Sequence, residues 1–179
     1  MLLILSCQEL IHVHHMSRYR ENLRTVCVIY MCKLCPYIMQ LYLDRLKRIQ
    51  FEFSADAFTL IGLNSANGNN DVSAESEFGA VSTFENMKAF AQQHELNFPY
   101  LWDSTQDVTC SFGAISTPTA DLIDNEGILR YKGQMDNHPR HPLIEGVDFL
   151  KNVIAALFQG QEIHPAQTEQ IGTPLIWRK

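Results

Sequence analysis

Two cysteines separated by two residues, Cys32 and Cys35, are the residues of this sequence best suited to chemistry. An apolar run precedes them and Pro36 follows, so we expect the pair at the turn from a strand into a helix. Two thiols at this spacing can close a disulfide with little backbone movement. Unpaired N–H groups and the helix dipole favour the first thiolate. The spacing therefore predicts a redox site in which Cys32 attacks a disulfide and Cys35 resolves the mixed disulfide.

Neighbouring residues are expected to stabilise the Cys32 thiolate, and the remaining cysteines are not expected to belong to the redox site. Lys33 adds positive charge, and Pro36 fits the first helical turn because its missing N–H costs nothing there. The other cysteines, Cys7, Cys27 and Cys110, occur singly. A zinc site would need a second pair of ligands at similar spacing, so we assign no metal site. We interpret Cys27 and Cys110 as small core residues.

The elements that must position these thiols follow from the apolar pattern. Apolar runs predict strands at 25–31, 58–63, 99–103, 119–124 and 128–132, the last two joined as a hairpin by Asn125-Glu126-Gly127. Helices are predicted after Pro36, from the capping box at 82–85, from a cap at Ser104 to about Gly113, and over about 143–158. The order β-α-β-α-β-α-β-β-α predicts an α/β protein with a mixed central sheet and helices on both faces.

Length, composition and charge narrow the class of protein. The chain has 179 residues, is 46% hydrophobic and has a net charge of -6. An acidic chain is a poor match for nucleic acid or an anionic membrane, so neither is expected as a partner. No apolar run reaches the roughly 18 residues of a membrane span. No basic residue precedes the short apolar start, so we expect a cytoplasmic protein. We divide the chain into a divergent segment 1–24, a domain 25–160 and a tail 161–179 packed on or near it.

A second motif, 113–118 (GAISTP), directly precedes the predicted strand at 119. With CKLCPY, DLIDNEGILRYKGQMD and the strand order, it resembles the thioredoxin-like redoxins of the peroxiredoxin-like type, in the alkyl hydroperoxide reductase/thiol-specific antioxidant superfamily. The resemblance covers roughly 25–179 and implies a thioredoxin-like fold with a C-terminal β-hairpin plus helix. It implies a cis Pro118 facing the C-x-x-C, and a Thr117 backbone that pairs with substrate beside Cys32. No cofactor is implied, and the expected partners are protein or small-molecule disulfides and thiols.

The sequence departs from its relatives at several sites. Peroxiredoxins have a Thr three residues before the peroxidatic cysteine, where Ile29 stands before Cys32, and an Arg where Thr117-Pro118 stands. Thioredoxin has a buried Asp six residues before its first cysteine, where this chain has Val26. Many relatives have a Gly-Cys-Ser-like tail, where this chain has Gly172-Thr173-Pro174. Without the Thr and the Arg, thiol–disulfide exchange is favoured over fast peroxidase chemistry.

Three alternatives stay open on the sequence alone. The first is a thiol peroxidase in which peroxide oxidises Cys32 to a sulfenic acid that Cys35 resolves. The second is a Cu(I) or other metal-thiolate binding module, with the two thiols near His12, His14 and His15. We interpret those histidines as a polar terminus, because no further ligand lies at a convincing spacing. The third is a degenerate domain that acts only in interactions.

Overall fold

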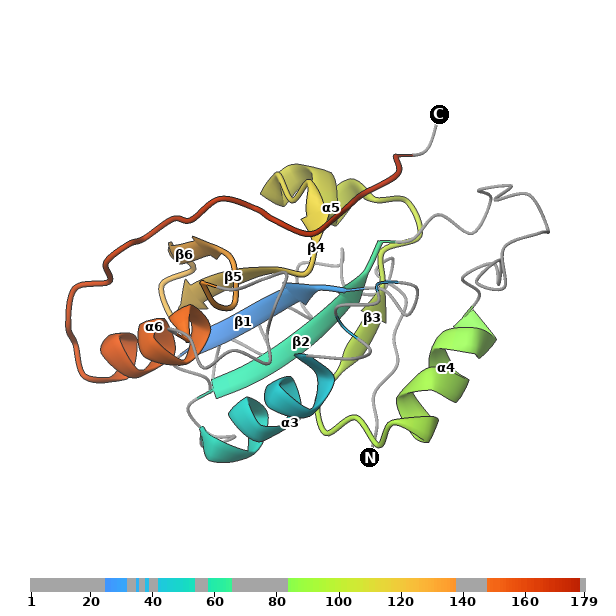
Figure 1. Cartoon of the computed structure of the whole chain (residues 1–179), viewed down its shortest axis with the longest axis horizontal. Coiled ribbons are helices and arrows are strands. Elements are labelled where there is room, and N and C mark those ends of the chain that lie inside the picture. The colour runs from blue at the N-terminus through green and yellow to red at the C-terminus, as the bar shows by residue number, and fades with distance from the viewer. Residues whose placement is uncertain are drawn as a thin grey trace.

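The computed structural model describes residues 25–31, 35, 38, 42–53, 58–65, 84–137 and 148–177. A five-stranded sheet has the order β3-β2-β1-β5-β6 (Figure 1). Its strands are β1 Thr25–Tyr30, β2 Phe58–Asn64, β3 Tyr100–Trp102, β5 Thr119–Asp124 and β6 Leu129–Gly133. The pairs β1–β2 and β2–β3 are parallel, whereas β1–β5 and β5–β6 are antiparallel. The sheet is therefore mixed, and β5 and β6 form the predicted hairpin.

Strand β1 lies at the centre of the sheet because it is apolar on both faces. All of its residues are buried. Cys27 and Ile29 belong to one core cluster, and Val26, Val28 and Tyr30 belong to the other. Successive side chains of a strand point to opposite faces, so a continuous apolar run needs cover on both sides. This confirms the prediction of a buried parallel strand before the C-x-x-C.

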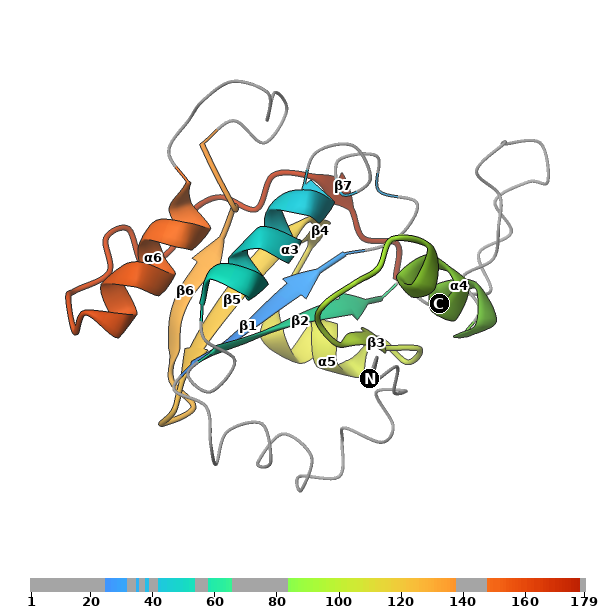
Figure 2. The same ribbon diagram turned by 90° about the horizontal axis from the view of Figure 1, so that it is seen from below.

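Helices supply that cover on both faces, as predicted. On one face lie α3 Leu43–Glu52, α4 Phe84–Gln93 and α6 Phe149–Phe158, and on the other lies α5 Asp107–Phe112 (Figure 2). The three helices of the first face contribute apolar residues at helical spacing, namely Leu43, Leu46, Ile49, Met87, Phe90, Ala91, Leu150, Val153 and Ile154. The predicted α/β class is therefore confirmed. No helix among the described residues is long and apolar enough to cross a membrane.

Acidic side chains bind the first turns of two helices. Helix α5 begins at Asp107 with Gln106 as its N-cap residue, so the predicted cap at Ser104 is wrong. The carboxylate of Asp103 instead accepts hydrogen bonds from the Thr109 N–H at 2.8 Å and from its hydroxyl at 2.6 Å. Helix α6 begins at Phe149, where the Asp148 side chain caps it by accepting a hydrogen bond from the Lys151 N–H at 2.9 Å, and the predicted start near 143 lies outside the described residues. The capping box at 82–85 lies mostly outside the described residues.

The chain after α6 returns across the domain and forms backbone hydrogen bonds with two strands, β6 and β4 Ser116–Thr117 (Figure 1). At β6, the Lys132 N–H donates to the Ala166 carbonyl at 3.0 Å and the Thr168 N–H donates to the Lys132 carbonyl at 2.9 Å. At β4, a two-stranded antiparallel sheet forms in which β4 pairs with β7 Thr173–Pro174. Neither contact was predicted from the tail, whose apolar residues have little periodicity.

Candidate active site

Cys35 is the predicted redox residue that the structure describes, and it is fully buried. Its Sγ donates a hydrogen bond to the Thr117 carbonyl oxygen at 3.4 Å. The same Sγ lies 3.7 Å from the hydroxyl oxygen of Thr173. Two segments remote in sequence therefore meet at this thiol. Cys32, Lys33 and Pro36 lie outside the described residues, so their roles stay predictions.

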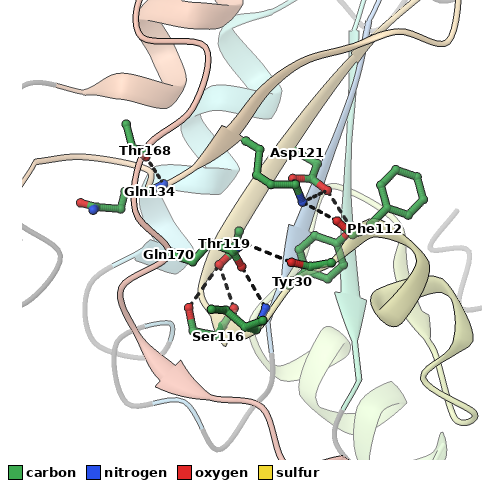
Figure 3. A network of polar contacts seen from close by, with 11 residues as sticks. Tyr30, Phe112, Ser116, Thr119, Asp121, Gln134, Thr168 and Gln170 are labelled. Carbon is green, nitrogen blue, oxygen red and sulfur yellow. Dashed lines mark hydrogen bonds and ion pairs between the residues drawn. The ribbon is translucent and has the colours of Figure 1, made fainter.

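The Thr117-Pro118 peptide bond is cis, as the resemblance implies. It connects β4 to β5, so the central sheet determines where the Thr117 carbonyl lies. Next to it the Thr119 hydroxyl donates to the Ser116 carbonyl at 2.8 Å (Figure 3). The structure thus brings the second cysteine and the Thr-Pro motif into contact across 82 positions of the sequence.

The sequence analysis placed the tail on or near the domain but missed its pairing with Thr117. The backbone of Thr117, expected to pair with a substrate chain, is paired in this structure with Thr173 of β7. Gly172 allows this approach, because a Cβ there would lie 2.3 Å from the Thr117 carbonyl oxygen. The available signal was the Gly-Thr-Pro triplet at 172–174, interpreted only as lacking a third thiol.

A buried ion pair joins Asp121 of β5 to Lys132 of β6 within the central sheet. The carboxylate of Asp121, on β5, accepts a hydrogen bond from the Tyr30 hydroxyl at 3.0 Å. The Lys132 ammonium lies 2.9 Å and 3.0 Å from its two oxygens and also donates to the Phe112 carbonyl at 2.7 Å (Figure 3). Burial raises the pKa of Asp121, and the bonds from Lys132 and Tyr30 oppose that rise. The sequence analysis noted that Val26 on β1 replaces the buried Asp of thioredoxin, and in the structure Asp121 of β5 places a buried carboxylate against Tyr30 of β1.

The other described cysteines differ from Cys35. Cys27 is fully buried in β1, and burial, followed by the charge of Asp121, raises its thiol pKa far above the ordinary value. It is a core residue, as predicted, because a thiol that stays protonated is a poor nucleophile. Cys110 is exposed on α5, so its assignment to the core is wrong. Its neighbour Thr109 takes the inward position on this short helix.

Of the residues named for the metal-thiolate alternative, His12, His14, His15 and Cys32 lie outside the described residues, so that alternative stays a prediction. Among the described residues no three His, Cys, Asp or Glu side chains are grouped as metal ligands would be. The thiol of Cys35 instead contacts a carbonyl and a hydroxyl. Such contacts can keep the Cys35 thiol in place until it reacts with a neighbouring sulfur.

The solved structures that resemble this chain share its fold. A hypothetical protein from Sinorhizobium meliloti 1021 is 24% identical, with a TM-score of 0.75 over 91% of this chain and 84% of that one. An uncharacterized conserved protein from Geobacillus kaustophilus is 23% identical, with a TM-score of 0.73 over 87% and 78%. A thiol-disulfide isomerase from Corynebacterium glutamicum is 21% identical, with a TM-score of 0.56 over 80% and 84%. At these identities the likeness establishes the thioredoxin-like fold.

The sequence profile of the AhpC/TSA family matches residues 9–132. The match begins within segment 1–24, which lies outside the described part of the structure. No curated protein sequence matches the chain. Because the profile covers more than half of it, the chain belongs to the AhpC/TSA family, whose members are thiol-based oxidoreductases.

Proposed function

We propose that this protein is a thiol–disulfide oxidoreductase in which Cys32 is the nucleophile and Cys35 the resolving thiol. The observation that carries the proposal is the contact between the Cys35 thiol and the Thr117 carbonyl, beside a cis proline. Membership of a family of thiol-based oxidoreductases supports it. Lys33 and Pro36 would tune the thiolate, and protein or small-molecule disulfides would be the substrates.

The reaction transfers two electrons from the dithiol to a substrate disulfide. The Cys32 thiolate attacks one substrate sulfur, forming a mixed disulfide and releasing the other sulfur as a thiolate. Cys35 gives up its proton, which the released substrate thiolate takes up, and its sulfur attacks the Cys32 sulfur. The bond between Cys32 and the substrate breaks, and the substrate leaves as a second thiolate. The protein is left with a Cys32–Cys35 disulfide, which an external dithiol must reduce.

Two environments hold the thiols before reaction. Cys32 is predicted at the start of a helix, where backbone N–H groups favour its thiolate. The sulfur of Cys35 is buried and donates to the Thr117 carbonyl. Cys35 therefore reacts within the protein, with the Cys32 sulfur, rather than with bulk substrate.

The test is mechanism-based trapping in a Cys110→Ser background, because Cys110 is exposed and would add its own disulfides. Adding Cys35→Ser should leave Cys32 joined to a substrate by a disulfide that mass spectrometry maps. The matched variant with Cys32→Ser should trap nothing. Titration of the unaltered pair in defined glutathione buffers should show a reversible two-electron disulfide. If no Cys32–Cys35 disulfide forms at any ratio, the proposal is wrong, and peroxide consumption and Cu(I) binding should be measured next.

A further inference from the structure

Besides the core cluster to which it belongs, the Cys35 sulfur is contacted by two polar groups of very different attachment. One is the Thr117 carbonyl, which belongs to the connection into the central sheet. The other is the segment 172–175, here named the strap, which contains β7 and places the Thr173 hydroxyl 3.7 Å from the Cys35 sulfur. Figure 2 shows β7 beside β4 at the end of the returning tail. The sulfur has no exposed surface while the strap is in place.

The tail is firmly held before it reaches the strap. The Thr168 hydroxyl accepts a hydrogen bond from the Gln134 N–H at 2.8 Å and lies 3.0 Å from the Tyr131 hydroxyl oxygen. Thr168 approaches Gly133 so closely that a Cβ there would lie 2.0 Å from the threonine hydroxyl oxygen. Together with the backbone bonds to Lys132, these contacts anchor the tail to β6.

The strap itself pairs with β4 over only two residues, and glutamine side chains hold the chain on either side of it. Before the strap, the Gln170 amide accepts from the Ile115 N–H at 2.9 Å and donates to the Gly113 carbonyl at 3.1 Å. After it, the Gln106 amide donates to the Ile176 carbonyl at 2.9 Å.

Within the strap, β7 pairs only Thr173 with Thr117 and Pro174 with Ser116, and the Leu175 N–H donates to the Ile115 carbonyl at 3.0 Å. Pro174 is exposed, and the next residues, Ile176 and Trp177, are 60% and 40% exposed. Segments with short ladders and little buried apolar surface open at low free energy. Release of the strap from β4 therefore breaks this short ladder and the flanking glutamine contacts, while the anchor on β6 remains.

We propose that the strap occupies the edge of β4 that an extended polypeptide disulfide uses, and that such a substrate must displace it. This inference rests on the proposed function. An incoming strand can replace the backbone bonds that β7 makes to β4, so the exchange leaves the number of paired groups nearly unchanged. A small disulfide needs only the Cys32 sulfur and not this edge. The strap thus disfavours extended polypeptides and leaves small disulfides unaffected.

The variant Gly172→Val tests this, because any Cβ at 172 would meet the Thr117 carbonyl oxygen at 2.3 Å and carbon at 2.7 Å. Glu169→Val adds the same side chain at an exposed tail position and is the matched control. In the folded, reduced proteins, alkylation of Cys35 by N-ethylmaleimide is followed by mass spectrometry. Gly172→Val should raise its rate by about tenfold or more, as the loss of one or two net hydrogen bonds would. Glu169→Val should leave it unchanged.

Cys27 is the internal reference, because it is buried in the central strand and reacts only on unfolding. If Cys27 and Cys35 accelerate together, Gly172→Val has unfolded, and Leu175→Ala replaces it. Leu175 is partly buried and packs against the core cluster that contains Tyr30, so its truncation loosens the strap without a clash. Leu175→Ala should raise the rate of Cys35 alkylation by about threefold, while Cys27 stays unalkylated. A Cys35 rate unchanged in the folded variants would overturn the proposal.

Turnover separates this inference from the proposed function. With a dithiol reductant, Gly172→Val should reduce insulin about fivefold faster or more, whereas reduction of a small aromatic disulfide should stay within about twofold. If Cys35 opens and the small disulfide is reduced but insulin reduction does not rise, the competition with polypeptide is wrong. If neither substrate is reduced by any variant, the proposed oxidoreductase function fails and the strap is only a cover.

Discussion

Cys27 and Cys35 are both fully buried, yet the regions around them are built differently. Cys27 lies within β1, which pairs with β2 on one side and β5 on the other. Cys35 lies beyond the end of β1, where a carbonyl and a hydroxyl from two-residue strands contact its sulfur. To expose the first thiol the sheet must come apart, whereas under our proposal release of the strap loosens the contacts around the second. We therefore expect the stability of the surrounding contacts, and not burial alone, to decide whether a buried thiol reacts.

The largest loss in the free energy of unfolding is expected inside the sheet, from Lys132→Met. Lys132 is the cation paired with the fully buried Asp121, so its loss leaves a charge uncompensated next to β1. Breaking a buried pair by removing one partner costs about 3–5 kcal/mol. Urea unfolding at neutral pH should show a loss of this size.

Two further variants make the Lys132→Met result specific. Lys151→Met removes an ion pair with Glu52 in which both side chains are about half exposed, and should cost less than about 1 kcal/mol. The double variant Lys132→Met/Asp121→Asn should recover part of the loss, because no buried charge remains. If Lys132→Met and Lys151→Met lowered the free energy of unfolding equally, the buried pair of Lys132 and Asp121 would not be a special contribution to stability.

The second effect compares the two thiols directly. Cys27→Ser places a hydroxyl among apolar side chains and should cost about 1–3 kcal/mol in the free energy of unfolding. Cys35→Ser keeps a donor that can reach the Thr117 carbonyl, so it should cost less than about 1 kcal/mol. Urea unfolding of the two reduced variants measures both costs. A greater loss from Cys35→Ser would reverse the comparison.

A smaller loss in the free energy of unfolding is expected from Asp124→Asn, at the end of β5 that lies away from Pro118. Burial alone would raise the pKa of Asp124, but the N–H groups of Ile128 and Glu126 and the Arg130 guanidinium bring it below the ordinary value. Its contribution to stability is therefore present above the ordinary carboxyl pKa and lost as pH falls through the lowered one. Asp124→Asn should cost about 1–2 kcal/mol at neutral pH.

Unfolding measured at decreasing pH checks the sign of this effect. The difference between the unaltered protein and Asp124→Asn should begin to shrink as the pH falls below the ordinary carboxyl pKa, and should be lost as the pH falls through the lowered pKa of Asp124. Glu126→Gln is the matched control, because Glu126 is 68% exposed and lies 3.7 Å from the same guanidinium. It should change stability by less than about 0.5 kcal/mol. A pH-independent cost for Asp124→Asn would exclude its ionisation as the cause.

Sequence patterns predicted the elements well where one segment contains the whole signal. The apolar runs of β1, β2 and β5 and the turn at Gly127 are local, and the structure confirms them. Helix starts were less predictable, since Gln106 and not the expected Ser104 is the N-cap residue of α5, and Asp103, outside the helix, binds its first turn. Cys110 was misassigned because a short helix shows too few turns to reveal which side faces inward.

The sequence by itself determined the local chemistry: a C-x-x-C after a buried strand, a Thr-Pro before another, and the strand and helix order that brings these motifs together. Only the tertiary structure decided what surrounds Cys35 and Asp121. Thr173 reaches Cys35 from 138 positions away, and Lys132 reaches Asp121 from the neighbouring strand. Local patterns specify strands and turns through backbone preference and side-chain periodicity. A contact between distant residues depends on how the whole chain folds back, and no single segment contains that information.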